Sequence, residues 1–508
     1  MTLASALLGA VGTLAAMLFV LRWSRTGSDL TPKSVAVVVL GDIGRSPRMM
    51  YHAQSLLEHG FTTYIVAYRG TNPPTELSNH PLCHFVYLAQ PLAWTSALPR
   101  IGFVAVAPFK VLLGAVALLQ ALVWTIPIRP AFIVVQNPPA IPTLPIVQLA
   151  SKWIRSKLVI DWHNTGYSVL ALRFQGRETA IVRIAKLVEL TFGKNAFAHL
   201  MVTETMRRQL VDLHGFKGKT IAFHDRPRAH FRRSTLQEAH KLFKRLPTLD
   251  TISFPQLDSL PRPRVEGSTL FTLPDGSLDP DRPALVITST SHTPDEDLSI
   301  LLRALSIYDL RARESSLLQP EERFPRVVML VTGKGQGKRE FERQVETLEP
   351  GWEFVRVRTE WLEIQDYPVL LGCGDLGISL HTSTSGYDLP MKVVDMFGCQ
   401  LPVLALEFPS IGELVQHGVN GRTFKTDSQL AQELIELLQG FPTTQSLSKL
   451  DLLRTGIKTA QYPVPSSSPT TSSSKNKSFD PDTDSDQGWT DWQRHWQRLV
   501  LPVFESVS

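Results

Sequence analysis

Three loops of this 508-residue chain combine glycine with polar or charged residues in patterns that suit a bound phosphate. The first is the run GDIGRSPR at residues 41–48, which follows a run of β-branched residues. Backbone N–H groups are free at such a strand-to-helix turn, and Arg45 and Arg48 add positive charge, so an anion is favoured there. The spacing matches neither G-x-G-x-x-G nor a P-loop, and a tight turn without a ligand is the alternative.

The second and third loops lie in the other half of the chain. Residues 332–338 are rich in glycine, and Lys334 among them offers a point charge for a diphosphate, with a solvated connection as the alternative. Residues 381–390 lead through Pro390 into a helix whose first N–H groups are unpaired. On that helix Lys392 can neutralise a phosphate. Asp395 can accept both hydroxyls of a ribose or, alternatively, serve as a buried structural carboxylate.

Short β-branched runs that alternate with helix-like segments are expected to position these loops. This alternation is typical of parallel α/β sheets, in which ligands bind outside the carboxyl ends of the strands. The polar residues after each run should therefore line one wall of a crevice. We predict strands at residues 35–40, 64–67, 132–135, 157–160, 199–202 and 220–223, and in the second half at 284–288, 327–331, 353–357, 376–380 and 402–406.

The membrane end of the chain is predicted from two apolar runs. Residues 3–21 carry no charge and approach the roughly 20 residues that a helix needs to cross a bilayer. Basic residues follow this run and none precedes it, which favours an anchor with the remaining chain in the cytosol over a cleaved signal peptide. The second run, residues 101–128, contains Pro108, Lys110 and Gln120. We expect it to lie in the membrane interface, with a buried core helix or a full span as alternatives.

Breaks in the strand pattern predict the domain organisation. A proline-rich stretch interrupts it between residues 232 and 282, and residues 463–487, rich in Ser, Thr, Pro, Lys and Asp, cannot bury enough apolar surface to fold. Beyond them Trp489, Trp492 and Trp496 are spaced as on a docked helix. We expect an anchor at 1–30, a first α/β domain at 31–235, a connection at 236–283, a second α/β domain at 284–445, a low-complexity insertion at 446–488 with a sequon at Asn476, and a helix at 489–508.

Composition excludes several protein classes. With 43% hydrophobic and 19% charged residues, the chain is too apolar for a disordered protein. Its 52 Lys and Arg are dispersed, which argues against nucleic-acid binding. Three widely separated cysteines form neither a metal-ligand motif nor a disulfide framework, which favours a reducing compartment. The Asp-x-Asp triplet at 295–297 is expected to cap a helix, and the one at 482–484 is expected to lie in the insertion. No metal site is therefore predicted.

Five runs together resemble one enzyme family. They are VVVLGDIGRSPRM at 37–49, QNPP at 136–139, DWHN at 161–164, STSHTPDED at 289–297 and GYDLPMK at 386–392. They resemble the β-1,4-mannosyltransferases that add the first mannose to dolichyl-diphosphate chitobiose, glycosyltransferase family 33. The resemblance covers residues 33–424. His292 departs from the Trp expected in many relatives, and the Ser/Thr-rich insertion is a second departure.

The resemblance implies a GT-B fold, with two Rossmann-like domains facing a cleft and an N-terminal transmembrane helix. GDP-mannose would bind mainly to the second domain and the lipid-linked acceptor mainly to the first. An α-linked donor and a β-linked product imply one inverting displacement assisted by a general base. Positive charge and helix N-termini would stabilise the leaving GDP, so no cofactor is obligatory, although a divalent ion could assist.

The resemblance also assigns roles to residues. The general base is expected among Asp42, Asp161, His163 and Glu204, with His163 and Asp42 favoured. Gly41, Gly44, Arg45 and Asn137 are expected to bind the acceptor or its diphosphate. Donor binding is assigned to Ser289, Thr290, Lys334, Ser385, Gly386, Asp388, Lys392 and Asp395.

The expected setting is the endoplasmic reticulum membrane, with a single pass and a cytosolic catalytic domain. The expected partners are GDP-mannose, dolichyl-diphosphate chitobiose, membrane lipid and the next mannosyltransferases of the pathway, but no nucleic acid. A retaining α-mannosyltransferase of the same pathway is one alternative, although Asp388 and Asp395 stand where such enzymes usually carry paired glutamates. A non-catalytic membrane scaffold is the other alternative.

Overall fold

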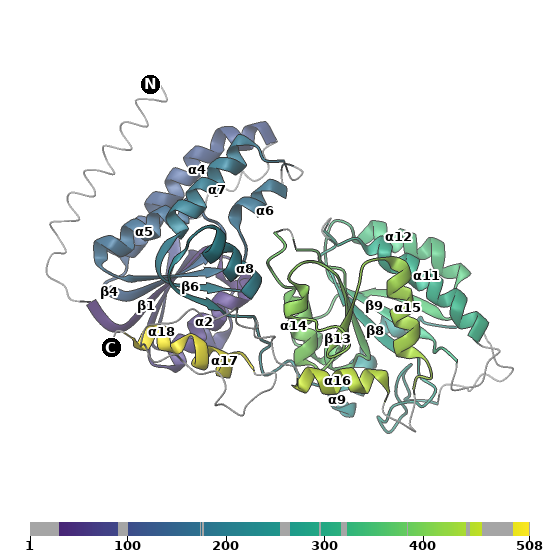
Figure 1. Ribbon diagram of the computed structural model, residues 1–508. Coiled ribbons are helices and arrows are strands. Elements are labelled where there is room, and N and C mark those ends of the chain that lie inside the picture. The colour runs from purple at the N-terminus through teal and green to yellow at the C-terminus, as the bar shows by residue number, and fades with distance from the viewer. Residues whose placement is uncertain are drawn as a thin grey trace, which may run out of the picture. The chain divides into compact units, whose positions relative to one another are not determined.

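The computed structural model describes residues 30–89, 100–172, 174, 177–254, 265–293, 296–315, 323–383, 385–442, 448–459 and 491–506. The chain forms two compact units: unit 1 runs to His224 and resumes at His495, and unit 2 comprises Asp225–Arg494. Each unit contains one sheet whose strand pairs are all parallel (Figure 1). The predicted anchor lies outside the described residues apart from its last residue, as do the sequon and Trp489.

The sheet of unit 1 has the strand order β3-β2-β1-β4-β5-β6-β7. Residues 35–39 of the interior strand β1 are buried because helices cover both faces. The strands are β1 (Leu30–Asp42), β2 (Thr62–Tyr68), β3 (Cys83–Leu88), β4 (Arg129–Asn137), β5 (Lys157–Trp162), β6 (Asn195–Met201) and β7 (Lys217–Ala222). The helices are η1 (Ile43–Arg45), α2 (Pro47–Glu58), α3 (Thr75–Ser78), α4 (Arg100–Gln120), η3 (Ala121–Thr125), α5 (Thr143–Ile154), α6 (Gly166–Leu172), α7 (Ala180–Gly193), α8 (Glu204–Arg208), η4 (Gln209–Leu213), α17 (Trp492–Leu499) and α18 (Leu501–Glu505).

Two helical layers enclose this sheet (Figure 1). Helices α4, α5, α6 and α7 lie on one face, and α2 and α18 lie on the other, with the part of α17 that belongs to unit 1. The C-terminal helices are held by aromatic contacts, for example between Phe504 and both Phe61 and Phe132. The predicted terminal helix is therefore present, and it completes the core of the first unit.

The sheet of unit 2 has the strand order β10-β9-β8-β11-β12-β13. One hydrophobic cluster, around Tyr308, joins it to α11 and α15, and another, around Phe397, joins it to α9, α13 and α14. The strands are β8 (Ala284–Ser289), β9 (Val327–Thr332), β10 (Val355–Glu360), β11 (Leu376–Ser379), β12 (Val403–Leu406) and β13 (Gly421–Phe424). The helices are α9 (Leu236–Phe243), α10 (Pro247–Asp250), α11 (Leu298–Ser315), α12 (Lys338–Leu348), η6 (Glu349–Gly351), α13 (Asp366–Cys373), α14 (Met391–Gly398), η7 (Ile411–Glu413), α15 (Asp427–Leu438) and α16 (Lys449–Thr459).

Several details differ from the sequence expectations. The edge strands β3 and β13 were not expected, although the other two edge strands, β7 and β10, were. Strand β10 starts at Val355 rather than at residue 353. The segment 236–283 is part of unit 2, since Leu242 and Phe271 are buried in its core. The predicted insertion at 446–488 begins with the ordered helix α16, whose Leu453 is buried.

The apolar segment 101–128 forms α4 and the π-helical turn η3. By length and composition alone, residues Pro108–Thr125 could cross a membrane, with a mean hydropathy of 1.6 and 28% of the window buried. Leu118 and Leu122 are buried, whereas Phe109 and Leu113 are exposed. The C-terminal part of the segment is therefore a core helix, one of the predicted alternatives. Phe109 and Leu113 leave apolar surface exposed ahead of it, and the expected place in the membrane interface stays a prediction.

Candidate active site

The carboxyl ends of β8 and β9 lie side by side, because parallel strands end at the same edge of a sheet. Ser289 Oγ is 3.0 Å from Thr332 Oγ1 and 3.0 Å from the Tyr367 hydroxyl. In the loop after β9, Lys334 Nζ lies 3.7 Å from the centre of the Trp361 ring, a cation–π contact. This edge of unit 2 thus brings together three hydroxyls, of which that of Thr332 is buried, and one ammonium. Such groups can bind phosphate oxygens or sugar hydroxyls.

A buried carboxylate, Glu296, organises the loop after β8. It accepts hydrogen bonds from Thr290 Oγ1 at 2.7 Å, from Ser291 N at 2.9 Å and from Lys392 Nζ. Burial alone would raise the pKa of Glu296, but Lys392 and these hydrogen bonds hold the pKa below its usual value. Because the Lys392 side chain is still 29% exposed, its remaining N–H donors are available to an anion.

The glycines of the 332–338 loop serve chain packing. A Cβ at Gly333 would lie 1.7 Å from the Thr290 carbonyl oxygen, and a Cβ at Gly335 would lie 1.8 Å from that of Ser291. Gly333 also has φ +140°. Glycine is therefore required because this loop packs directly on the loop after β8, whatever anion the loop also binds.

Asp388 orders the turn that precedes α14. Its carboxylate accepts a hydrogen bond from the Ser383 hydroxyl and a longer one, 3.4 Å, from Ser385 Oγ, and it lies 3.5 Å from His381 Nε2. Burial alone would raise the pKa of Asp388, but His381 and Ser383 hold the pKa below its usual value. Gly386 in this turn has φ +79°. The geometry gives Asp388 a structural part in shaping the start of α14, where Lys392 lies.

Asp395, predicted to bind a ribose, has an unusual carboxyl group. Burial, together with the charge of Asp225, raises its pKa from 3.8 to about 8. Its carboxyl group is therefore protonated at neutral pH and can donate as well as accept a hydrogen bond. Burial and the nearby Asp395 raise the pKa of the Tyr367 hydroxyl, which contacts Ser289, so Asp395 lies near the same group of polar side chains.

This raised pKa predicts the effect of Asp395→Asn on stability. The unfolded chain loses the Asp395 proton near pH 4, while the folded chain keeps it up to about pH 8, so stability falls across that window. Asn has no proton to lose. We expect the variant to melt at a higher temperature than the wild type, with the gap widening between about pH 5 and pH 8. Calorimetric melting at both pH values tests this, and a gap independent of pH would contradict it.

In unit 1 a second cluster surrounds Asp161 at the end of β5. Asp161 is fully buried and accepts hydrogen bonds from Arg48 Nε and Nη2 at 2.9 Å and contacts His163 Nε2 at 2.8 Å. His52 Nε2 lies 3.3 Å away. Burial alone would raise the pKa of Asp161, but Arg48 and the histidines hold the pKa well below its usual value. Asp161 is thus a poor general base, and Arg48 is engaged by Asp161 rather than open to a phosphate.

His163 is the most exposed member of this cluster. Its side chain is 22% exposed, against 4% for Arg48, 1% for His52 and 0% for Asp161. An ionised carboxylate only accepts hydrogen bonds, so the ring hydrogen of neutral His163 belongs on Nε2 and Nδ1 keeps a free lone pair. This geometry fits a general base oriented by a buried carboxylate.

Asp42, the other favoured base, caps the turn η1. It accepts hydrogen bonds from Gly44 N at 3.0 Å and from Thr71 N and Oγ1 at 2.9 Å, and it lies 3.6 Å from Arg45 Nε. Burial alone would raise the pKa of Asp42, but the bonds from Thr71 and Gly44 hold the pKa below its usual value. A Cβ at Gly44 would lie 2.5 Å from the Thr71 carbonyl, so this glycine serves packing, whereas one at Gly41 would make ordinary contacts.

Two more predicted residues have internal partners. Asn137 is buried, and its Nδ2 donates to Glu189 Oε1 at 2.6 Å and to the Asn164 carbonyl at 3.2 Å. Its Nδ2 therefore supports the loop after β5, while its buried Oδ1 has no hydrogen-bond partner among the described residues, and the acceptor-binding role stays a prediction. Glu204 is paired with Arg207 at 2.6 Å, which lowers its suitability as a base.

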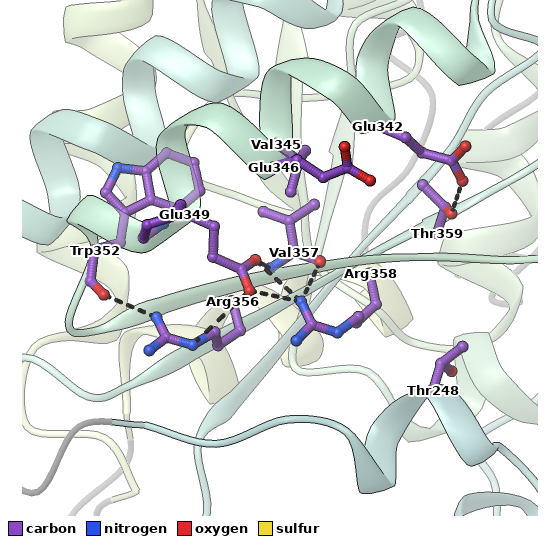
Figure 2. A pocket seen from close by; sticks show the side chains of 11 residues that line it. Thr248, Glu342, Val345, Glu346, Glu349, Trp352, Arg356, Val357, Arg358 and Thr359 are labelled. Carbon is purple, nitrogen blue, oxygen red and sulfur yellow. Dashed lines mark hydrogen bonds and ion pairs between the residues drawn. The ribbon is translucent and has the colours of Figure 1, made fainter.

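A cavity of about 550 Å³ lies at the edge strand β10, away from the predicted site residues (Figure 2). Glu349 lies between its two arginines: Arg358 Nη1 donates to Glu349 at 2.8 Å, and Arg356 Nη1 donates to the Trp352 carbonyl at 2.9 Å. Because both guanidinium groups already have protein partners, the cavity is not a ready anion site. Its lining comprises Thr248, Glu342, Val345, Glu346, Glu349, Pro350, Trp352, Arg356, Val357, Arg358 and Thr359.

Glu296 and His52 are two charged or titratable residues of the site that sequence reasoning missed. Glu296 lies within the triplet at 295–297, and His52 follows Arg48 by one helical turn on the buried face of α2. The available signal for Glu296 was an acidic residue next to a polar loop. The available signal for His52 was a second ionisable residue on the same helix face as Arg48. Within the described residues, no three His, Cys, Asp or Glu side chains lie close enough together to hold a metal ion.

Comparisons with known proteins give a consistent family. A model for glycosyl transferases group 1 matches residues 283–440. UDP-glycosyltransferase TURAN of Arabidopsis thaliana is 41% identical over 80% of this chain and 89% of its own length. The chitobiosyldiphosphodolichol beta-mannosyltransferase of Homo sapiens is 38% identical over 86% of this chain and 91% of its own length. The enzyme of the same name from Dictyostelium discoideum is 39% identical over 79% of this chain and 83% of its own length.

Solved structures of glycosyltransferases share the fold. HepE of Anabaena in complex with UDP aligns with a TM-score of 0.54 at 15% identity, covering 84% of this chain and 93% of that one. WaaG, a glycosyltransferase involved in lipopolysaccharide biosynthesis, aligns with a TM-score of 0.53 at 13% identity, covering 83% and 94%. At these identities the likeness shows the fold alone, which is the GT-B arrangement of two Rossmann-like parallel sheets.

Proposed function

Because the chain belongs to the chitobiosyldiphosphodolichol beta-mannosyltransferase family, we propose that it moves mannose from GDP-α-mannose to dolichyl-diphosphate chitobiose. The product would carry mannose in β-1,4 linkage on the non-reducing GlcNAc, the first mannosylation of the lipid-linked glycan. The observation that carries the chemistry is the pair formed by buried Asp161 and partly exposed His163, 2.8 Å apart.

The reaction is an inverting displacement. His163 Nδ1 takes the proton of the acceptor hydroxyl while the hydroxyl oxygen attacks the anomeric carbon of mannose. The bond between the anomeric carbon and the phosphate oxygen of GDP breaks, and its electron pair stays on that oxygen. Asp161 stabilises the imidazolium that results, as a buried carboxylate does in hydrolytic triads. A retaining transferase would need no base at this position.

The strand-end groups of unit 2 supply the donor site in this proposal. Lys392 and the free N–H groups at the start of α14 face the charge that develops on GDP, and the protonated Asp395 hydrogen-bonds the ribose. These charges support catalysis without an obligatory metal ion. The Arabidopsis relative is named as a UDP-glycosyltransferase, so the donor nucleotide itself needs a direct test.

The test is a transfer assay with the purified chain, lipid-diphosphate chitobiose and either GDP-mannose or UDP-sugars, with and without EDTA. We expect transfer from GDP-mannose alone, unaffected by EDTA, and a product that β-mannosidase cleaves. An α-mannosidase-sensitive product would favour the retaining alternative, and no transfer with any donor would favour the scaffold.

The outer helical layer of unit 1 supports association with the membrane. Ile184 and Leu187 of α7 are 58% and 68% exposed, on the side of the helix opposite buried Val182 and Ala185. Outward apolar side chains beside basic ones, such as Arg183, suit an anionic lipid surface. We propose that this face and the exposed part of α4 rest on the endoplasmic reticulum membrane, where the next mannosyltransferases of the pathway would be partners.

Polar substitutions on this face test the membrane contact. We expect Ile184→Glu combined with Leu187→Glu to raise KM about 10-fold for the lipid-linked acceptor in anionic vesicles, because charged side chains do not enter lipid. KM for a short-chain soluble acceptor should not change. Leu310→Glu, at a site 58% exposed on α11, is the matched control. Equal KM values for the double variant and the wild type in vesicles would contradict this prediction.

A further inference from the structure

A line of four side chains leads from the C-terminal helix to the candidate base. Trp496 Nε1 donates to His52 Nδ1 at 3.0 Å. His52 Nε2 lies 3.3 Å from Asp161 Oδ2, and the same oxygen lies 2.8 Å from His163 Nε2. Trp496 is fully buried, and it lies 444 residues from His52 in the sequence.

The chemistry of the indole fixes the state of His52. An indole N–H can only donate, so His52 Nδ1 must be the acceptor. In a neutral ring the single hydrogen then belongs on Nε2, which lies 3.3 Å from Asp161 Oδ2. Burial lowers the pKa of His52, and the charge of Arg48 acts in the same direction while Asp161 opposes it. A neutral His52 with its hydrogen toward Asp161 is the state that these neighbours favour.

Asp161 Oδ2 is shared, which makes its orientation sensitive to His52. Arg48 contacts both carboxylate oxygens, at 2.9 Å for Nε to Oδ2 and 2.9 Å for Nη2 to Oδ1. His52 and His163 both approach Oδ2. Without the hydrogen on His52 Nε2, Arg48 alone would orient the Asp161 carboxylate, and the contact between Asp161 and His163 would weaken.

We propose that Trp496 and His52 are positioning residues, which hold Asp161 so that His163 keeps Nδ1 as the proton acceptor. This inference rests on the proposed function, in which His163 is the base. It gives the C-terminal helix a part in the chemistry of unit 1: the segment after the Ser/Thr-rich stretch returns to the α2 face of the sheet and completes the network (Figure 1).

The experiment removes one N–H and keeps the ring. In the full chain, we expect Trp496→Phe to lower kcat about 5-fold, the worth of one buried hydrogen bond, with KM for donor and acceptor unchanged. The acidic limb of the kcat–pH profile should move to lower pH, because an Asp161 carboxylate that is held less firmly stabilises protonated His163 less. Trp492→Phe, at a buried position one turn earlier in α17, is the matched control and should match the wild type.

Substitutions of His52 supply a rescue. Gln can accept from the indole and donate to Asp161, so His52→Gln should keep most of kcat, while His52→Ala should lose at least as much as Trp496→Phe. A merely structural role would lower the melting temperature without moving the pH profile. Trp496→Phe with wild-type kcat and an unmoved profile would overturn the inference.

A second measurement separates this inference from the proposed function. Nitrogen-15 shifts of the histidine-labelled full chain should show His52 protonated on Nε2 alone, and Trp496→Phe should shift the His163 resonances. Unmoved His163 resonances would overturn the inference even if the chain transferred no mannose. Conversely, absent transfer, or a His163 variant with full kcat, would count against the proposed function, while the shifts would still report on the coupling.

Discussion

Replacing Lys392 with methionine should lower kcat/KM for GDP-mannose by about 100- to 1,000-fold, the usual cost of removing one charge-stabilising donor. Methionine keeps the length of the side chain but removes the ammonium at the start of α14. The substitution also leaves Glu296, whose side chain is 3% exposed, without its cation. The negative charge of Glu296 would then oppose the negative charge that develops on the leaving diphosphate. Steady-state kinetics and calorimetric titration with GDP measure both effects.

Glu296 separates catalysis from folding in this experiment. Lys392→Met alone should lower the melting temperature, because it leaves a buried carboxylate unpaired. Adding Glu296→Gln should restore much of the stability without restoring transfer. Lys425→Met, at a surface site whose Nζ lies 3.2 Å from Glu407, is the matched control and should transfer normally. If the Lys392 variant kept more than a tenth of wild-type kcat/KM, the donor assignment would be wrong.

Replacing His163 with glutamine should lower kcat about 1,000-fold, within the range for loss of a general base, while KM for GDP-mannose stays unchanged. Glutamine can still donate a hydrogen bond to Asp161 but has no basic nitrogen. The fold of unit 1 should therefore survive, because the buried network of Arg48, His52 and Asp161 keeps its partners. Single-turnover transfer of labelled mannose measures the chemical step directly.

The matched control for His163 is His84→Gln, an exposed histidine on the edge strand β3. It should leave kcat unchanged. If the His163→Gln variant kept the wild-type kcat, the assignment of His163 as the general base would be wrong. Asp42 would then be the next candidate, although its carboxylate oxygens already bind Gly44 and Thr71.

The sequence by itself determined the class of fold and the placement of the polar loops. Most buried strands of both parallel sheets were predictable because a strand covered on both faces must be an apolar, β-branched run, which is a local property of the chain. The loops at 332–338 and 381–390 follow such strands, so their place at the strand ends also followed from the sequence. The edge strand β13 escaped prediction because its four residues, Gly-Arg-Thr-Phe, form no such run, whereas β3 was missed although Phe85–Leu88 is apolar.

Only the tertiary structure decided which side chains are partners. Arg48 and Asp161 lie 113 residues apart, and Lys392 and Glu296 lie 96 apart, so no local pattern could show that these charges meet. A free arginine and an arginine bound to a buried carboxylate look alike in sequence. The protonation state of Asp395 depends on burial in the same way. Distance and desolvation set these interactions, and both arise only when remote segments pack together.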